Sequence, residues 1–146
     1  EVFNKAGEIT KAAGLKWGYH NHNHEFDRVG KDDNGRGGDV VYDLMLNNTD
    51  PKLVFFEMDV YWTVMGQNDP LEYFAKYPGR FPVLHIKDRL VLGKSGMMNF
   101  ENIFNAAYKN GLDEFYVEIE GIRGEMTQFE GVKQCFEYLN NAKFVK

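Results

Sequence analysis

The sequence predicts an α/β fold built on a parallel sheet. Strand-like runs alternate along the chain with helix-like segments, which is the pattern of consecutive βαβ units. The strand-like runs are also nearly continuously apolar, as expected where helices cover the sheet. Four such units form either a small doubly wound sheet or half of an eight-stranded barrel.

Local signals mark the ends of most elements. Gly14 and Gly111 end helices, whereas Asp69 followed by Pro70, and also Asn99, begin them. A polar segment rich in Gly and Asp, residues 26–38, predicts a hairpin or a mobile loop. The expected helices span residues 2–13, 40–46, 69–76, 99–110 and 127–140, and the expected strands span residues 15–20, 53–60, 82–87 and 114–118.

Composition and charge narrow the class of function. With 146 residues, 43% of them apolar and 15% aromatic, the chain can bury one core, and we expect a single domain over residues 1–146. A net charge of −5 argues against a nucleic-acid partner and offers no attraction to anionic lipid. A small-molecule ligand is therefore expected, with neither nucleic acid nor membrane as a partner.

Cysteine usage and the N-terminus bear on localisation. Cys135, the single cysteine, falls in an apolar-periodic segment and is expected to be a buried helix residue, so the chain has no disulfide framework. The sequence has no apolar run of membrane-spanning length and no signal-peptide pattern. We expect a soluble protein and favour the cytoplasm. Because the chain begins at Glu1, an excised leader, and hence export, or an upstream domain stays open.

Three of the four histidines lie at alternate positions directly after the first expected strand: His20, His22 and His24. In extended backbone alternate side chains project to the same side, and neutral imidazole is the commonest metal ligand. The alternatives are a polar loop or a hydrogen-bonding network.

Residues able to bind a divalent metal follow every expected strand. Because ligands bind beyond the carboxyl ends of parallel strands, these side chains are expected to meet. A mixed set of imidazole and carboxylate ligands is typical of a site for Mn²⁺, Co²⁺, Fe²⁺ or Zn²⁺ with open positions, rather than of a structural zinc site, which favours thiolates. Mg²⁺ also stays open. Such a metal polarises a carbonyl and stabilises an enediolate while a carboxylate moves the proton. Sugars that carry a carbonyl group are substrates suited to this chemistry. The residues are His20 and His22, Glu57 and Asp59, His85, Lys87 and Asp88, and Glu118 and Glu120.

Several short motifs resemble one enzyme family. They are VFFEMDVYW, VLHIKD, the LGKSG turn leading into MNFENIFNAAYKNG, and FYVEIE. Their order and spacing resemble the sugar phosphate isomerase/epimerase family, the xylose isomerase-like TIM barrels. The resemblance covers nearly the whole chain. It implies the C-terminal half of such a barrel, strands five to eight, with the first four units missing.

The resemblance also implies metal ligands. The family's aspartate on the sixth strand matches Asp59, its histidine on the seventh matches His85, and its glutamate on the eighth matches Glu118. Other roles stay open for each residue. Asp59 could be a solvated cap, His85 a hydrogen-bonded core histidine, and Glu118 could give its role to Glu120.

The chain departs from the family on the fifth strand. Many members carry a glutamate there as ligand and base, whereas GYHNH aligns His20 with it and places His22 two residues later. Histidine ligates, but it is a different base from a carboxylate with a tuned pKa. This puts the two-carboxylate epimerase mechanism in doubt, and leaves isomerisation or a β-elimination from a keto-sugar like that of the family's inosose dehydratases. We assign catalytic roles to Glu118, His20 and Lys87, and metal ligation to Asp59, His85, Glu118 and His20.

The expected substrate contacts surround these residues. Trp62 and Tyr61 either stack on a sugar ring or pack under a loop. Lys87 either contacts a substrate oxygen or pairs with Asp88 or Glu120. We also assign substrate binding to His22 and Glu120.

Nothing in the sequence marks a phosphate site. No Gly-rich turn opens a helix, and Arg89, Lys94 and Arg123 are only candidate anion contacts. We therefore favour a neutral or oxidised sugar.

A second hypothesis is a metal-independent sugar-binding or scaffold half-barrel, inactive because its N-terminal half is absent. Half a barrel exposes sheet edges and apolar surface. In either case we expect a homo-oligomer or the missing N-terminal half as the partner that covers them.

Overall fold

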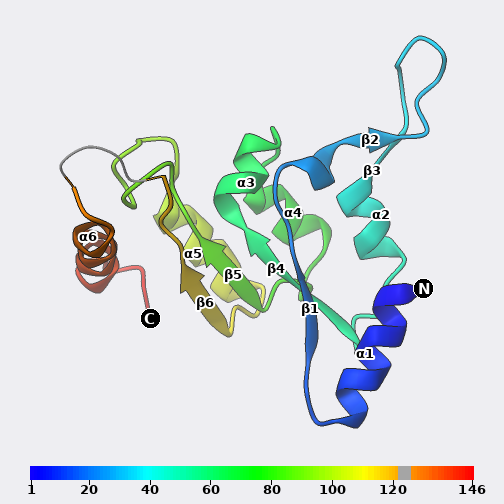
Figure 1. Cartoon of the computed structure of the whole chain (residues 1–146), viewed down its shortest axis with the longest axis horizontal. Helices are drawn as coiled ribbons and strands as arrows, with labels where there is room; N and C mark the ends of the chain where they lie inside the picture. Colours follow the sequence, from blue (N-terminus) through cyan, green and yellow to red (C-terminus); the bar gives the residue numbers. More distant parts are fainter. Residues whose placement is uncertain (122–125) are drawn as a thin grey trace.

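The fold is a four-stranded parallel sheet with helices packed along it (Figure 1). The computed structural model describes residues 1–121 and 126–146. The strand order is β1-β4-β5-β6, so every strand pairs with the next parallel strand of the chain, as in a barrel. The strands are β1 (Trp17–His20), β4 (Val54–Asp59), β5 (Val83–Ile86) and β6 (Glu114–Val117).

Helices connect the strands much as the sequence predicts. The predicted caps are present: Asp69 accepts a hydrogen bond from the N–H of Leu71, and Asn99 from that of Asn102. Residues 26–38 lie largely in the predicted hairpin, whose antiparallel strands β2 and β3 carry the loop that projects in Figure 1. The remaining elements are α1 (Val2–Ala12), η1 (His24–Phe26), β2 (Arg28–Val29), β3 (Asp39–Val40), α2 (Val41–Asn47), α3 (Val60–Met65), α4 (Pro70–Lys76), α5 (Phe100–Lys109) and α6 (Gln128–Asn140).

The predicted end of the second strand was wrong by one residue, and the helix that follows it was missed. Strand β4 stops at Asp59, because its side chain accepts a hydrogen bond of 2.8 Å from the N–H of Trp62 and so caps α3, a helix the sequence did not predict. Strand β1 stops at His20 as predicted, and His22 and His24 lie beyond it.

The core lies between the sheet and its helices. Phe56 and Met58 of β4, together with Leu84 and Ile86 of β5, are completely buried. Because side chains alternate along a strand, the residues between them face the opposite, inner side of the sheet. Asp59 and His85, which pair across β4 and β5, lie on that side. The predicted burial of Cys135 in a helix is confirmed.

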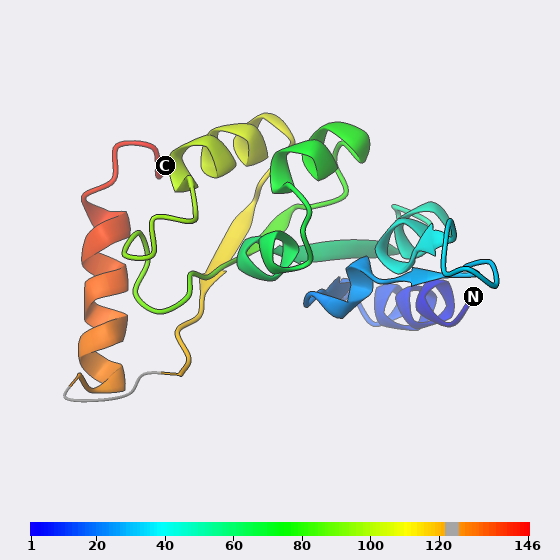
Figure 2. The ribbon, with the colours of Figure 1, turned by 90° about the horizontal axis from the view of Figure 1, so that it is seen from above.

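The sheet curves, and its two ends lie far apart. Helix α1 stands at one end of the molecule and α6 at the other (Figure 2). In the part of the chain that the structure describes, β1 and β6 each have a strand neighbour on one side only. This open, curved sheet is half of a barrel rather than a closed one. Among the described residues, none of the helices has the length and apolar character needed to span a bilayer.

Candidate active site

Three predicted metal ligands converge at the carboxyl ends of adjacent strands. His20 ends β1, Asp59 ends β4 and His85 lies on β5. Each offers one ligand atom, and these atoms lie within 4.8 Å of one another. The convergence follows from the parallel order, because β4 pairs with both β1 and β5.

Asp59 is the buried centre of this cluster. Its side chain has no exposed surface, and its Oδ1 accepts the N–H of Trp62. Its Oδ2 has no hydrogen-bond partner among residues 1–121 and 126–146, and lies 3.8 Å from Nε2 of His20. Burial raises the pKa of Asp59 to about 7. An uncompensated buried carboxylate is costly, and a bound cation would remove that cost.

The two histidines supply nitrogen atoms suited to a metal. Their rings lie 4.5 Å apart, and both Nδ1 of His20 and Nε2 of His85 are buried without a hydrogen-bond partner in the described chain. Burial, and then the neighbouring His85, lower the pKa of His20. A neutral imidazole is the form that ligates. Two imidazoles and a buried carboxylate therefore fit a divalent metal.

Glu118 lies beside this cluster rather than in it. Its Oε2 is 3.3 Å from Nε2 of His85 and 3.5 Å from Nζ of Lys87, and its side chain is 38% exposed. The contact with His85 lacks hydrogen-bond geometry. Glu118 thus approaches the histidine from the open side, where a fourth ligand or a base would stand.

Lys87 is a buried cation on the inner face. It is 2% exposed, and its Nζ lies 2.6 Å from Oε1 of Glu120 and 5.7 and 5.9 Å from the ring centroids of Tyr61 and Trp62. Its ion pair with Glu120 is one of the predicted alternatives, and the hydrogen bond from Lys87 lowers the pKa of Glu120.

Asp88, the other partner considered for Lys87, has a different role. Its carboxylate accepts the backbone N–H groups of Arg89 at 2.6 Å and of Gly93 at 2.9 Å. Asp88 therefore shapes the loop after β5.

The predicted substrate contacts Trp62 and His22 lie at the rim of the cluster. The ring of His22 is 5.0 Å from that of His20 and 5.7 Å from that of Trp62. The indole Nε1 of Trp62 is buried and has no acceptor among the described residues. It is a donor available to a ligand oxygen, a polar contact that the stacking prediction did not include.

Sequence reasoning missed two buried residues that shape the loop after β1. Oδ1 of Asn21 accepts the hydroxyl of Tyr42 at 3.0 Å and the N–H of Asp59 at 3.1 Å. Glu25 accepts the N–H of His22 at 2.7 Å and contacts His24, whose Nε2 lies 3.0 Å away. His24 therefore contacts Glu25 rather than the metal cluster. Neither residue follows a periodic pattern, so burial is the only signal that identifies them.

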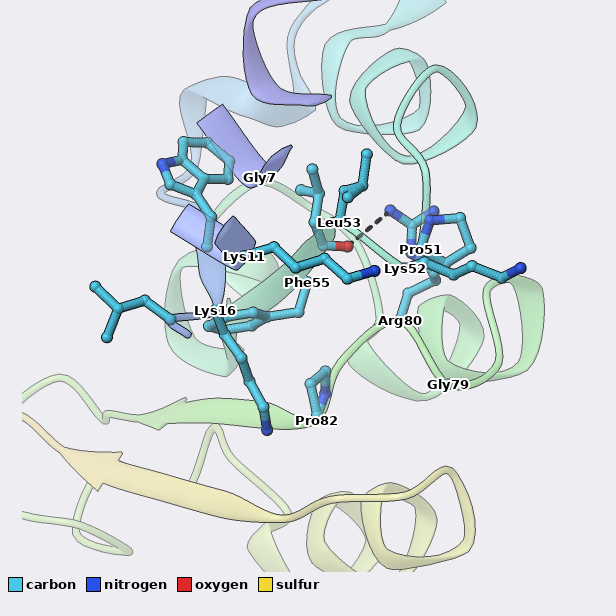
Figure 3. A pocket seen from close by; sticks show the side chains of 13 residues that line it. Gly7, Lys11, Lys16, Pro51, Lys52, Leu53, Phe55, Gly79, Arg80 and Pro82 are labelled. Atoms are coloured by element: carbon cyan, nitrogen blue, oxygen red, sulfur yellow. Dashed lines mark hydrogen bonds between the residues drawn. The ribbon is translucent and has the colours of Figure 1, made fainter. Parts of the chain in front are cut away.

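A cavity of about 320 Å³ lies at the opposite ends of the strands (Figure 3). Lys11, Lys16 and Lys52 line it together with Arg80, which donates to the carbonyl of Leu46 at 2.6 Å. It opens near Trp17 and Val54, where β1 and β4 begin, and so lies away from the metal cluster.

Two of the three candidate anion contacts lie in the part of the chain that the structure describes. Arg89 and Lys94 are exposed, and Arg123 lies outside the described residues.

Comparisons with solved structures identify relatives. Two crystal structures described as sugar phosphate isomerase/epimerases from Parabacteroides distasonis ATCC 8503 match 99% of this chain. They are 56% and 53% identical to it, with TM-scores of 0.93 and 0.94. No family model and no curated protein matches the chain.

The match covers 53% of each of these proteins, so the chain spans about half of their length. That proportion agrees with the four-stranded half-barrel. In sequence and in fold, the chain is a relative of the sugar phosphate isomerase/epimerases, the family that its motifs resemble.

Proposed function

We propose that this chain carries the metal site and the proton-transfer groups of a sugar isomerase or epimerase. The observation that carries the proposal is the cluster of His20, Asp59 and His85, with its unpartnered buried carboxylate oxygen. A bound divalent cation would polarise a substrate carbonyl and lower the cost of charge on its oxygen.

The proposed substrate is a polyhydroxy carbonyl compound. The relatives are described as sugar phosphate isomerase/epimerases. Buried Lys87 and the indole N–H of Trp62 are donors suited to sugar oxygens. We favour a neutral or oxidised sugar, because within the described ranges Lys87 is the one lysine or arginine that forms an ion pair with these site residues, and it is paired with Glu120.

Glu118 is the proposed base. Its carboxylate stands between His85 and Lys87 and is partly open to solvent, so a substrate carbon can reach it. Lys87 lies 3.5 Å away and would steady both the carboxylate and an adjacent substrate oxygen. His20 stands where the family resemblance implies a second carboxylate, so we propose that a single carboxylate base moves the proton next to the carbonyl. This favours isomerisation, with β-elimination as the runner-up.

The test is proton exchange. A panel of keto-sugars is incubated in deuterated water with the chain, with and without Mn²⁺ or Zn²⁺, and followed by NMR. We expect metal-dependent deuterium at the carbon next to the carbonyl. Glu118→Gln should abolish it, and the matched Glu114→Gln on the exposed start of β6 should not.

A labelled substrate reveals internal proton return, which hides exchange. The proposal is overturned if product forms without metal, without deuterium uptake from the solvent and without transfer of the substrate's own labelled proton.

A second candidate is a metal-independent sugar-binding half-barrel. It is favoured by the match to only 53% of each relative, since the rest of their length is not represented here. Elemental analysis of the purified chain separates the two. Stoichiometric metal supports the enzyme, and sugar binding without metal supports the binding protein.

A further inference from the structure

We propose that Glu57 is a positioning residue that fixes His85 of the metal cluster and makes Nε2 the nitrogen that His85 presents to the metal. The inference rests on the metal binding proposed above. The sequence places Glu57 among the metal-capable residues at the strand ends, but Glu57 is neither one of the four assigned ligands nor one of the three clustered residues.

The place of Glu57 in the sheet is the first argument. It stands two residues before Asp59 on β4, so both side chains project from the inner face, with Glu57 one step further from the carboxyl end. Strand β4 lies between β1 and β5, which carry the two histidines. Glu57 therefore sits beneath the cluster with a histidine on each side.

The distances match this placement. Oε1 of Glu57 lies 3.1 Å from Nδ1 of His85 in hydrogen-bond geometry, and 4.0 Å from Nδ1 of His20. The opposite nitrogens face other groups: Nε2 of His20 lies 3.8 Å from Oδ2 of Asp59, and Nε2 of His85 lies 3.3 Å from Oε2 of Glu118. Only Nδ1 of His85 is within hydrogen-bond distance of Glu57, since Nδ1 of His20 has no hydrogen-bond partner among the described residues.

The chemical consequence concerns the tautomer. A carboxylate accepts only, so it favours the imidazole that carries its proton on Nδ1, and Nε2 then keeps its lone pair for a metal. Nε2 of His85 is buried and has no partner in the described residues, as this arrangement requires. Outer carboxylates of this kind also raise the basicity of the ligating nitrogen, and their loss costs about 10–100-fold in metal affinity.

Three variants separate positioning from ligation. Glu57→Gln keeps the volume and a carbonyl oxygen that accepts from Nδ1–H, but loses the charge. Glu57→Ala loses the acceptor. Glu114→Gln is the matched control, because Glu114 is exposed at the far end of β6. Titration calorimetry with Zn²⁺ should give a loss of about 10–100-fold for Glu57→Ala, a smaller loss for Glu57→Gln and none for Glu114→Gln.

Nitrogen NMR of the histidine rings supplies a readout that a merely structural role would not move. We expect His85 to be protonated on Nδ1 in the wild-type chain and in Glu57→Gln, and to lose that preference in Glu57→Ala. Circular dichroism establishes that each variant is folded.

The failures are distinguishable. If the wild-type chain does not bind Zn²⁺, the metal site itself is wrong. If it binds and Glu57→Ala binds equally well with unchanged tautomers, Glu57 has no positioning role. If Glu57→Gln loses binding as completely as Glu57→Ala and Zn²⁺ bonds to Nδ1, Glu57 is a ligand and the inference is overturned.

Discussion

The middle of the sheet and its two ends differ sharply in how well they are covered. Phe56, Leu84 and Phe104 of the middle units are fully buried. At the ends, Val2 of α1 is 77% exposed, whereas Phe129 and Phe136 of α6 are 79% and 66% exposed. Apolar surface of this extent normally lies against another part of a protein.

The same gradient runs through the candidate site. The side chains of Asp59 and Lys87, on β4 and just after β5, are 0% and 2% exposed, while those of His20, Glu118 and Glu120, beside the end strands, are 25%, 38% and 53% exposed. Asp59 and His85, two of the three proposed metal ligands, therefore belong to the middle of the half-barrel, whereas His20 stands on an end strand. The exposure of Glu118 and Glu120, which we propose to meet the substrate, depends on what covers the ends.

The largest expected effect is the difference in the free energy of unfolding that a Phe→Ala substitution costs in the middle of the sheet and at its end. Phe56→Ala should lower the free energy of unfolding by about 3–5 kcal/mol, because it leaves a cavity in the core. Phe136→Ala should change it by less than about 0.5 kcal/mol if α6 faces solvent. Denaturant unfolding of both variants gives the comparison.

A large cost for Phe136→Ala would break the comparison. It would show that α6 is covered in solution, by a second copy or by another half-barrel. Unfolding at two protein concentrations separates these cases, because only self-association makes the cost depend on concentration.

The second prediction concerns the cost of the buried carboxylate. Burial raises the pKa of Asp59 from 3.8 to about 7, so between these pH values the folded state holds more protons than the unfolded state. Stability of the metal-free protein should therefore fall as pH rises through this window. Asp59→Asn should recover a few kcal/mol at pH 8, at roughly 1.4 kcal/mol per pKa unit, and almost nothing at pH 4.

Asp59→Asn should also lose Zn²⁺ binding, which calorimetry measures. The exposed Asp113→Asn is the control. If Asp59→Asn is no more stable than wild type at pH 8, the buried carboxylate of Asp59 does not destabilise the fold as its burial indicates.

The third prediction addresses the exposed face of α6. Val132 and Phe136 lie on one side of that helix and line an apolar groove of about 420 Å³ against Val117 and Phe115. We expect the chain to associate through this face. Substituting Val132→Lys and Phe136→Lys should weaken association by about 1.5–3 kcal/mol for each buried side chain lost.

Sedimentation at several concentrations measures that change. Lys133→Glu, on the exposed surface of the same helix, controls for charge. A wild-type chain that stays monomeric and unfolds cooperatively would show that the open sheet is self-sufficient.

Much of the sheet could be predicted because its signals are local. Apolar runs gave the four strands, and parallel order then brought His20, Asp59 and His85 to one edge. Helix starts followed from single capping residues such as Asn99, whose side chain accepts the N–H of Asn102. These features depend on a few neighbouring residues.

The missed features depend on contacts between distant segments. Helix α3 has the strand-like sequence Val60-Tyr61-Trp62, yet it is capped by Asp59, which accepts hydrogen bonds from the N–H of Trp62 and the hydroxyl of Thr63. The contact of Glu57 with His85, 28 residues away, requires the register of two strands. Periodicity gives the face on which a residue lies but not its neighbour across the sheet.

The smallest predicted effect uses two helix caps to compare the regions. Asn99 caps α5 beside the middle of the sheet, and Thr127 caps α6 at the end, each accepting the N–H three residues on. Replacing a cap by Ala costs a helix about 1 kcal/mol. Asn99→Ala should lower global stability by that amount, because α5 carries fully buried core residues and packs against α4.

Thr127→Ala should instead speed amide hydrogen exchange within α6 and leave exchange of β4 unchanged, if α6 opens without the rest of the fold. Equal losses of protection in β4 for both variants would show that the ends unfold together with the middle, and that exposure alone does not make the ends independent.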